Sequence, residues 1–306
     1  MLKRLISDKL FNIIIYASFI FLIVGLYQAD YLKIPTIKST SLMLLSFPVM
    51  FVGFWFYCYQ WGKILKHNGE PTHWASQIAA GGLPIFAKYI PGKLWSLIGR
   101  AAYSNKYDGV NLGEASLMSM KAQVITIWLG FFYGIVGYMY ASSLSFESML
   151  SMAALFAATP IFFFQKPADY VNSFINRKFN KEIEITMLDW PTVRTLFLPT
   201  SMKWLFWSAG FYLMAQSLLA DPIHVTSGLC FALATNIGIV AIFAPGGIGV
   251  REGMIVFYLN YLGVGFSDAT TIAVFSRLWY LVGETFLFVM GVAADRYYRY
   301  KIRWEE

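Results

Sequence analysis

The sequence predicts an all-α polytopic membrane protein, and three observations support this fold class. Of the 306 residues, 58% are apolar and only 13% are charged. The mean hydropathy of +0.55 is far above that of soluble domains. Several apolar runs reach the roughly 20 residues that a helix needs to cross a bilayer, and none shows the alternation of barrel strands. We therefore treat residues 1–306 as a single integral membrane domain.

Six apolar runs are long enough to form full spanning helices. They are residues 11–27, 40–60, 118–141, 148–165, 196–219 and 267–293. The first is too long for a signal peptide and has no A-x-A-like cleavage site after it, so we expect it to be a span. The polar stretch 166–192 predicts either a short amphipathic helix on the membrane surface or a plain linker.

Two further apolar stretches are interrupted near their middle by Pro-Gly. Residues 75–107 contain YIPGK, and residues 226–265 contain APGGI. Proline fits the first turn of a helix and glycine permits a tight turn, so each break should end one half-helix and start another. The arm 250–263 would be about 21 Å long, short of the roughly 30 Å apolar core. We therefore favour broken, re-entrant hairpins; two full spans or a proline-kinked helix are the alternatives.

The distribution of Lys and Arg predicts the orientation in the membrane. Segments rich in them are the two termini, 61–74, 100–111 and the connection 166–195, whereas 142–147 and 220–225 contain none. Because basic loops stay inside, we expect a multi-pass protein of the cytoplasmic membrane with both termini and the 166–195 connection in the cytoplasm. The first hairpin would then enter from the cytoplasm and the second from outside. The net charge of +7 is explained by these loops and does not indicate nucleic-acid binding.

A weak internal repeat relates the two parts of the chain. A shift of 154 residues places Pro91-Gly92 on Pro245-Gly246 and brings span 118–141 close to the sixth span. Each half, 1–145 and 146–306, then reads span, span, broken hairpin, span, and the two halves start on opposite sides. This arrangement is an inverted-topology repeat, which many transporter folds share.

The two breaks are candidates for an anion-binding site. A half-helix that begins inside a membrane presents free N–H groups and the positive end of its dipole, which favour an anion. A cation follows each break, Lys93 the first and Arg251 the second. We predict that a negatively charged head group, such as a phosphate, binds there. The break residues assigned to this site are Pro91, Gly92, Lys93, Pro245, Gly246, Gly247 and Gly249.

Charged residues at membrane depth extend the site. Such charges are costly unless they are paired or hydrated. The adjacent Arg251 and Glu252 form either a binding cation with its orienting carboxylate or an anchor at the outer interface. Arg277, Tyr280 and Glu284 follow at i, i+3 and i+7 and so share one helix face. Arg277 lies roughly 15 Å into its span, too deep to snorkel easily, so this face should look into the bundle.

Two lysines have a stronger structural alternative. Lys121 maps within two residues of Arg277 under the repeat shift, and we include it in the predicted site. It lies near the cytoplasmic end of its span, where it could instead snorkel to the surface. The same alternative applies to Lys203, which we leave outside the predicted site. No G-x-S-x-G, H-E-x-x-H or C-x-x-C occurs, so we assign no catalytic or metal residue and expect no cofactor.

The motif APGGIGVREG, with YIPGK upstream and FSRLWYLVGE in the last span, resembles the transmembrane region of lysylphosphatidylglycerol synthases. The resemblance covers essentially the whole chain and implies a helical membrane domain with paired re-entrant segments. In two-domain synthases this region is associated with moving the modified lipid between leaflets. This sequence ends at RYYRYKIRWEE, so we expect the soluble aminoacyl-transferring domain to be absent. Trp95 and Ser96 stand where many relatives have a small and an acidic residue, which indicates a different lipid.

The resemblance implies a flippase-like or scramblase-like lipid transporter rather than an enzyme. Stand-alone relatives often accompany surface-polysaccharide synthesis, so the expected substrate is an anionic or polyprenyl-phosphate-linked lipid with a phosphate head group. The alternatives are a membrane transferase that uses Glu252 as its base, or a non-transporting member of a polysaccharide assembly complex. A second copy of the chain or enzymes of envelope biosynthesis are the protein partners that this interpretation leaves open.

Overall fold

The computed structural model describes residues 35–90, 94–141, 150, 188–241 and 247–305. These residues form helices and no strand, in agreement with the predicted all-α class. The predicted first span 11–27, nearly all of span 148–165 and most of the connection 166–195 lie outside the described residues.

Four long helices form the frame of the described structure. They are α2 (Thr40–His67), α5 (Leu112–Ala141), α8 (Trp190–Leu218) and α11 (Phe266–Glu305). They correspond to the predicted spans 40–60, 118–141, 196–219 and 267–293. By length and composition α2, α5 and α11 can cross a membrane. α8 has 29 residues but is less apolar, because its buried face carries polar side chains such as Ser201, Lys203 and Ser208.

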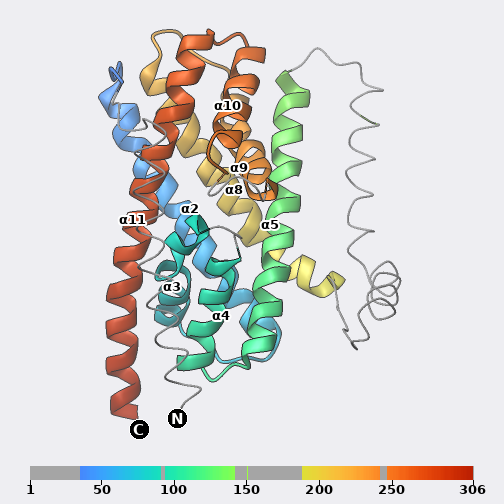
Figure 1. Cartoon of the computed structure of the whole chain (residues 1–306), viewed down its shortest axis with the longest axis vertical. Coiled ribbons are helices and arrows are strands. Elements are labelled where there is room, and N and C mark those ends of the chain that lie inside the picture. The colour runs from blue at the N-terminus through green and yellow to red at the C-terminus, as the bar shows by residue number, and fades with distance from the viewer. Residues whose placement is uncertain (1–34, 91–93, 142–149, 151–187, 242–246, 306) are drawn as a thin grey trace.

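Shorter helices occupy both stretches that Pro-Gly interrupts. The first contains α3 (Trp74–Gly82), the 3₁₀ helix η1 (Ile85–Tyr89) and α4 (Trp95–Tyr107). The second contains η3 (Val225–Leu229), α9 (Cys230–Val240) and α10 (Val250–Tyr261). The longest of these, α4, has 13 residues and therefore extends roughly 20 Å, less than the thickness of an apolar core. In Figure 1, α3 and α4 lie in the lower half of the molecule, and α9 and α10 lie in the upper half.

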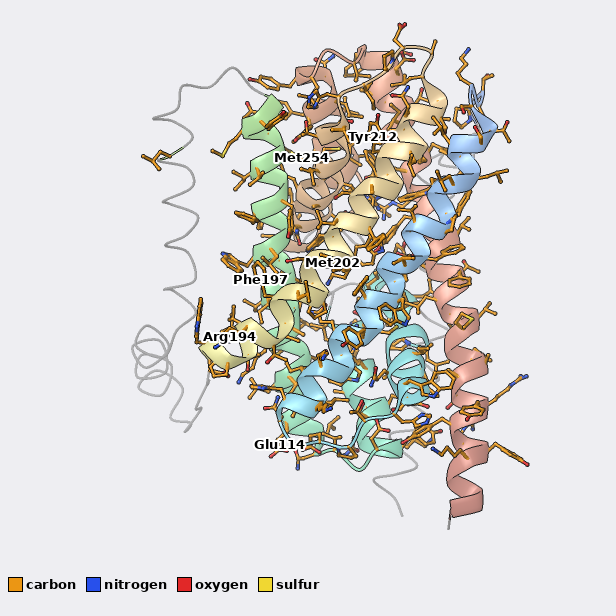
Figure 2. All side chains as sticks on the ribbon, turned by 180° about the vertical axis from the view of Figure 1, so that it is seen from behind. Glu114, Arg194, Phe197, Met202, Tyr212 and Met254 are labelled. Atoms are coloured by element: carbon orange, nitrogen blue, oxygen red, sulfur yellow. The ribbon has the colours of Figure 1, made fainter. Side chains whose placement is uncertain are left out.

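Corresponding long helices run in opposite directions. In Figure 1, α2 and α11 run downward from the end that holds the α10–α11 turn, while α5 and α8 run upward. In Figure 2 the labelled residues Arg194, Phe197, Met202 and Tyr212 follow α8 along this upward course. An inverted repeat predicts this antiparallel relation, because α2 corresponds to α8 and α5 corresponds to α11.

The packing of the helices follows the same pairing. α2 packs most extensively on α8, its counterpart. The last long helix of each half packs on the hairpin of the other half, α11 on α3 and α5 on α9 and η3. Within each half the long helix also contacts the second arm of its own hairpin, α5 with α4 and α11 with α10. These reciprocal contacts support the predicted halves 1–145 and 146–306, which stay a prediction.

Small residues permit close crossings between the long helices and the hairpins. At the crossing of α3 with α11, a Cβ atom on Gly82 would lie 2.4 Å from the carbonyl oxygen of Leu287 and 3.0 Å from the Cα of Gly291. At the crossing of α5 with α9, a Cβ atom on Gly134 would lie 2.4 Å from the Cβ of Leu233. Such glycines let helix backbones approach closely, as is common between helices in membranes.

Candidate functional site

A cavity of about 450 Å³ lies between the two hairpins and is also lined by α2, α5, α8 and α11. Its wall carries aromatic side chains, such as Trp204, and neutral polar side chains, such as Gln123. Four cationic side chains also line it: Lys88, Lys203, Arg251 and Arg277. Among the described residues no carboxylate lines the cavity, so its charged wall is entirely positive.

Glu252 joins the start of α10 to α11 from behind this wall. One carboxylate oxygen accepts a hydrogen bond from Arg277 Nε at 3.1 Å and lies 2.9 Å from Arg277 Nη2. The other oxygen accepts the backbone N–H of Gly249 at 2.8 Å. The protein's own carboxylate therefore satisfies the N–H at the N-cap of α10 and holds the Arg277 guanidinium in place. The sequence analysis made Glu252 the orienting carboxylate of Arg251, whereas the structure pairs it with Arg277, because the side chain turns toward α11.

Arg251, the neighbour of Glu252, faces the cavity. Its side chain is buried, with Nη2 donating to Ser276 Oγ at 3.3 Å. Its guanidinium carbon lies 4.8 Å from the centre of the Phe231 ring and 5.5 Å from that of Tyr280. No described carboxylate lies within ion-pair distance of Arg251, and its Nε has no described acceptor. Arg251 is thus a buried cation held by one hydroxyl group and two aromatic rings.

Three glycines bring this part of the second hairpin together. Gly247 has φ +69°, a conformation that side-chain-bearing residues rarely adopt. A Cβ atom on Gly247 would lie 2.9 Å from the Cα of Gly238 in α9, and a Cβ on Gly238 would lie 3.3 Å from the Cβ of Arg251. Gly249, at the N-cap of α10, has φ +81°. These glycines let α9 and α10 approach closely enough to place Arg251 in the cavity wall.

Glu284 connects α11 to the first hairpin. Its side chain is fully buried, forms an ion pair with Lys88 and accepts a hydrogen bond from the Tyr89 hydroxyl at 2.8 Å. The Lys88 ammonium also lies 5.0 Å from the centre of the Tyr280 ring. Tyr280 therefore lies between Lys88 of one hairpin and Arg251 of the other. The predicted shared face of Arg277, Tyr280 and Glu284 indeed points into the bundle.

Lys203 occupies another part of the cavity wall. Its ammonium donates to Gln60 Oε1 at 2.9 Å and to Thr126 Oγ1 at 2.8 Å. The side chain is only 1% exposed, which excludes the alternative that it snorkels to the surface. The rings of Tyr57, Trp204 and Trp207 surround it at 5.7 to 5.8 Å from the ammonium nitrogen to each ring centre.

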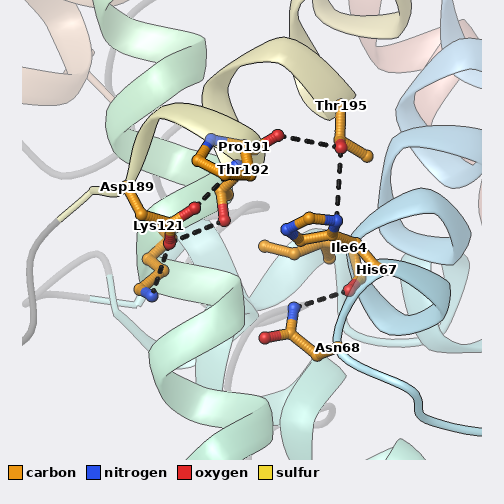
Figure 3. A network of polar contacts seen from close by, with 8 residues as sticks. All are labelled: Ile64, His67, Asn68, Lys121, Asp189, Pro191, Thr192 and Thr195. Carbon is orange, nitrogen blue, oxygen red and sulfur yellow. Dashed lines mark hydrogen bonds and ion pairs between the residues drawn. The ribbon is translucent and has the colours of Figure 1, made fainter.

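Lys121 is a residue of α5 and lies away from the cavity, beside the beginning of α8. Its ammonium lies 3.4 Å from Asp189 Oδ2 (Figure 3). Asp189 is the N-cap of α8 and accepts the backbone N–H of Thr192 at 2.7 Å. Burial raises the pKa of Asp189, but the hydrogen bonds from Thr192 and the nearby Lys121 outweigh this effect and lower it below its usual value. The structure therefore gives Lys121 a partner at a helix end and does not bring it to the other predicted site residues.

The structure brings most of the described predicted residues together: Gly247, Gly249, Arg251, Glu252, Arg277, Tyr280 and Glu284. Pro91, Gly92, Lys93, Pro245 and Gly246 lie outside the described residues.

The sequence analysis did not include several residues that line or support the cavity. Lys88 and Tyr89 stand just before the first break, and their polar groups inside an apolar stretch were the signal available for them. Gln60 and Thr126 give no such signal, because their role depends on contacts across 66 positions of sequence. Of the two residues that depart from the resembling family, Ser96 lines the cavity and Trp95 begins α4.

Comparison with known families gives one match. The family model described as "Lysylphosphatidylglycerol synthase TM region" matches residues 4–287 of the 306-residue chain. The match includes both hairpins and all the residues of the charged cavity. No curated protein and no solved structure matches the chain.

Proposed function

This chain belongs to the family of the lysylphosphatidylglycerol synthase transmembrane region, and on that basis we propose that it moves an anionic lipid between the leaflets of a membrane. The family places the chain among membrane proteins linked to lipid handling. Transport, the phosphate head group and the cytoplasmic membrane as location are the parts that we propose.

The observation that carries this proposal is the cavity wall, which presents four cations and no described carboxylate. A positive charge inside a membrane protein is costly unless a counter-charge or water accompanies it. A phosphate head group supplies the missing negative charge and accepts several hydrogen bonds at once. The cavity is therefore suited to an anionic head group.

In the proposed mechanism the head group enters the cavity while its acyl chains stay in the surrounding lipid. Arg251 and Arg277 contact the phosphate. Glu252 holds the Arg277 guanidinium, and Glu284 holds Lys88, so that both cations keep a fixed direction. Rocking of the two inverted halves about the α2–α8 contact would open the cavity to one leaflet and then to the other.

Leaflet exchange in reconstituted liposomes tests the proposal. The liposomes contain a fluorescent phosphatidylglycerol, and a membrane-impermeant quencher reports the fraction of lipid that reaches the outer leaflet. We expect protein-dependent exchange that falls about tenfold or more in Arg251→Gln, because the variant loses a charge that contacts the head group. Arg194→Gln is the control, because Arg194 is exposed at the beginning of α8.

One outcome would contradict transport, and another would contradict the role of the cavity. One is the absence of protein-dependent exchange for a panel of anionic lipids. The other is equal exchange by Arg251→Gln and Arg194→Gln, which would show that the lipid does not use the cavity. Formation of a modified lipid in the same vesicles would favour the transferase alternative.

A further inference from the structure

The four cations that line the cavity fall into two classes. Lys88 is paired with Glu284, and Arg277 is paired with Glu252. Arg251 and Lys203 have only neutral hydrogen-bond partners among the described residues: Ser276 for Arg251, and Gln60 and Thr126 for Lys203. The cavity wall therefore carries two buried basic side chains that form no ion pair with a described carboxylate.

These two cations lie at different places along the wall. The Lys203 ammonium is 5.7 Å from the centre of the Trp207 ring. The Trp207 and Tyr280 ring centres are 5.4 Å apart, and the Arg251 guanidinium carbon is 5.5 Å from the Tyr280 ring centre. The two rings thus link the cations through successive contacts, with Arg251 on α10 of the second hairpin and Lys203 on α8.

Three polar atoms near these two cations also lack described hydrogen-bond partners. Within the described structure, Trp207 Nε1, Arg251 Nε and Thr235 Oγ1 are buried and have no hydrogen-bond partner, and all three residues line the cavity. A further cation, Arg100, lies nearby. Its guanidinium carbon is 4.4 Å from the ring centre of Tyr57, which lines the cavity. A buried donor without a hydrogen-bond partner costs free energy, so the cavity wall favours a ligand with many acceptor oxygens.

We propose that the cavity binds a lipid head group with two separate anionic groups, one at Arg251 and the other at Lys203. The rings of Trp207 and Tyr280 would pack against the spacer between the two groups. This inference rests on the proposed function and adds the substrate class: a lipid with two phosphates, or a phosphate and a carboxylate, joined through a short polar spacer.

Binding of a matched lipid pair tests the inference. The probes are dioctanoyl phosphatidylinositol and dioctanoyl phosphatidylinositol 4-phosphate, which share the spacer and differ by the second phosphate. For the purified wild-type chain in detergent, we expect phosphatidylinositol 4-phosphate to bind at least tenfold more tightly than phosphatidylinositol. In Lys203→Gln this preference should fall below about threefold. Lys203→Arg, which keeps the charge, and Lys66→Gln, which changes an exposed lysine, should both retain the preference.

The outcomes separate this inference from the proposed function. If phosphatidylinositol binds and exchanges in an Arg251-dependent manner but the second phosphate adds less than threefold in wild type, the two-anion inference is wrong and transport stands. Retention of the full preference by folded Lys203→Gln also overturns the inference. If neither lipid binds and no anionic lipid exchanges, both are wrong. The ratio of the affinities of the wild-type chain for the two lipids tests the inference even where Lys203→Gln does not fold.

Discussion

Glu284 is the most deeply buried charged residue of the site, with a side chain that is 0% exposed. It is also the only described group at this place that connects the first hairpin to α11 by an ion pair, through Lys88. The carboxylate has a structural role in addition to its proposed role in orienting Lys88.

Glu284→Gln should therefore destabilise the protein. The variant leaves Lys88 without its counter-charge, and breaking a buried pair on one side costs about 3 kcal/mol. The matched control is Arg299→Gln, whose pair with Asp295 is an i, i+4 pair with the arginine side chain 46% exposed and should cost under about 1 kcal/mol. Thermal unfolding in detergent measures both. Equal midpoints for the two variants would show that Glu284 does not hold the hairpin.

Asp189 gives a prediction with a pH dependence. Removing the N-cap of α8 in Asp189→Ala should cost about 1 kcal/mol at pH 7, whereas Asp189→Asn keeps a capping oxygen and should cost less. Because the folded pKa of Asp189 lies below the usual value, its contribution is complete above about pH 4 and is lost as the pH falls through the folded pKa. The difference between the unfolding midpoints of Asp189→Ala and wild type should thus become smaller in acid, because the protonated side chain keeps a capping oxygen but loses its charge. A difference that grows as the pH falls would contradict the pKa shift.

At this scale the sequence indicated part of the site. The spacing of Arg277, Tyr280 and Glu284 is local to one helix, so their common face could be predicted from sequence. The partners of those residues could not, because Lys88 meets Glu284 across 196 positions. Lys121 and Lys203 illustrate the same limit: both are lone lysines in apolar runs, and only tertiary contacts place one at a helix end and the other in the cavity.

At the scale of elements, the crossing of α3 with α11 brings the first hairpin against the second half of the chain. Gly82→Ala should destabilise the protein by about 1–3 kcal/mol, because its Cβ would meet the Leu287 carbonyl oxygen at 2.4 Å and backbone atoms cannot yield easily. Gly253→Ala is the control. Gly253 is an exposed helical glycine with no atom within 4 Å of an added Cβ, so alanine should be neutral or stabilising there by up to about 1 kcal/mol.

Thermal unfolding of the two alanine variants checks this crossing. Similar midpoints for Gly82→Ala and Gly253→Ala would show that α3 and α11 do not pack as described. The Pro-Gly breaks themselves were visible in the sequence, because proline and glycine act locally on the backbone. Which helix each hairpin packs on was not visible, since a Cβ-free crossing such as Gly82 with Gly291 depends on the arrangement of the whole bundle.

At the scale of the whole molecule, the orientation of the chain in the membrane can be tested with single cysteines. Glu114, at the beginning of α5, lies at the lower end of Figure 2, whereas the α10–α11 turn that contains Gly265 lies at the upper end of Figure 1. The predicted topology places Glu114 in the cytoplasm and Gly265 outside. Cys58 and Cys230 are both buried, so they should react little.

In intact cells, an impermeant thiol reagent should therefore label Gly265→Cys and leave Glu114→Cys unlabelled until the membrane is opened. Gly265 suits this purpose because nothing lies within 4 Å of an added Cβ there. Labelling of Glu114→Cys alone would reverse the predicted orientation. Labelling of both from outside would contradict a bundle whose two ends face opposite sides.

The general architecture was predictable because it depends on composition and on long periodic features. Apolar runs of spanning length correspond to the long helices, and the directions of α2, α5, α8 and α11 agree with the repeat that a shift of 154 residues predicts. The reciprocal packing of α11 on α3 and of α5 on α9 was not predictable, because the identity between the halves is weak. The charged cavity arises at that packing and so appears only in the folded molecule.

The most direct test of the central claim is to locate the lipid head group in the protein. A phosphatidylglycerol analogue with a photoreactive head group is reconstituted with the chain and irradiated, and the cross-linked peptides are mapped by mass spectrometry. We expect cross-links in segments that line the cavity, at residues 88–89, at residues 235–239 and at Arg251, and their loss in the presence of excess unlabelled phosphatidylglycerol. Cross-links confined to outward-facing side chains such as Leu44, Leu198 and Val289 would show that the head group stays outside the cavity and would contradict the claim.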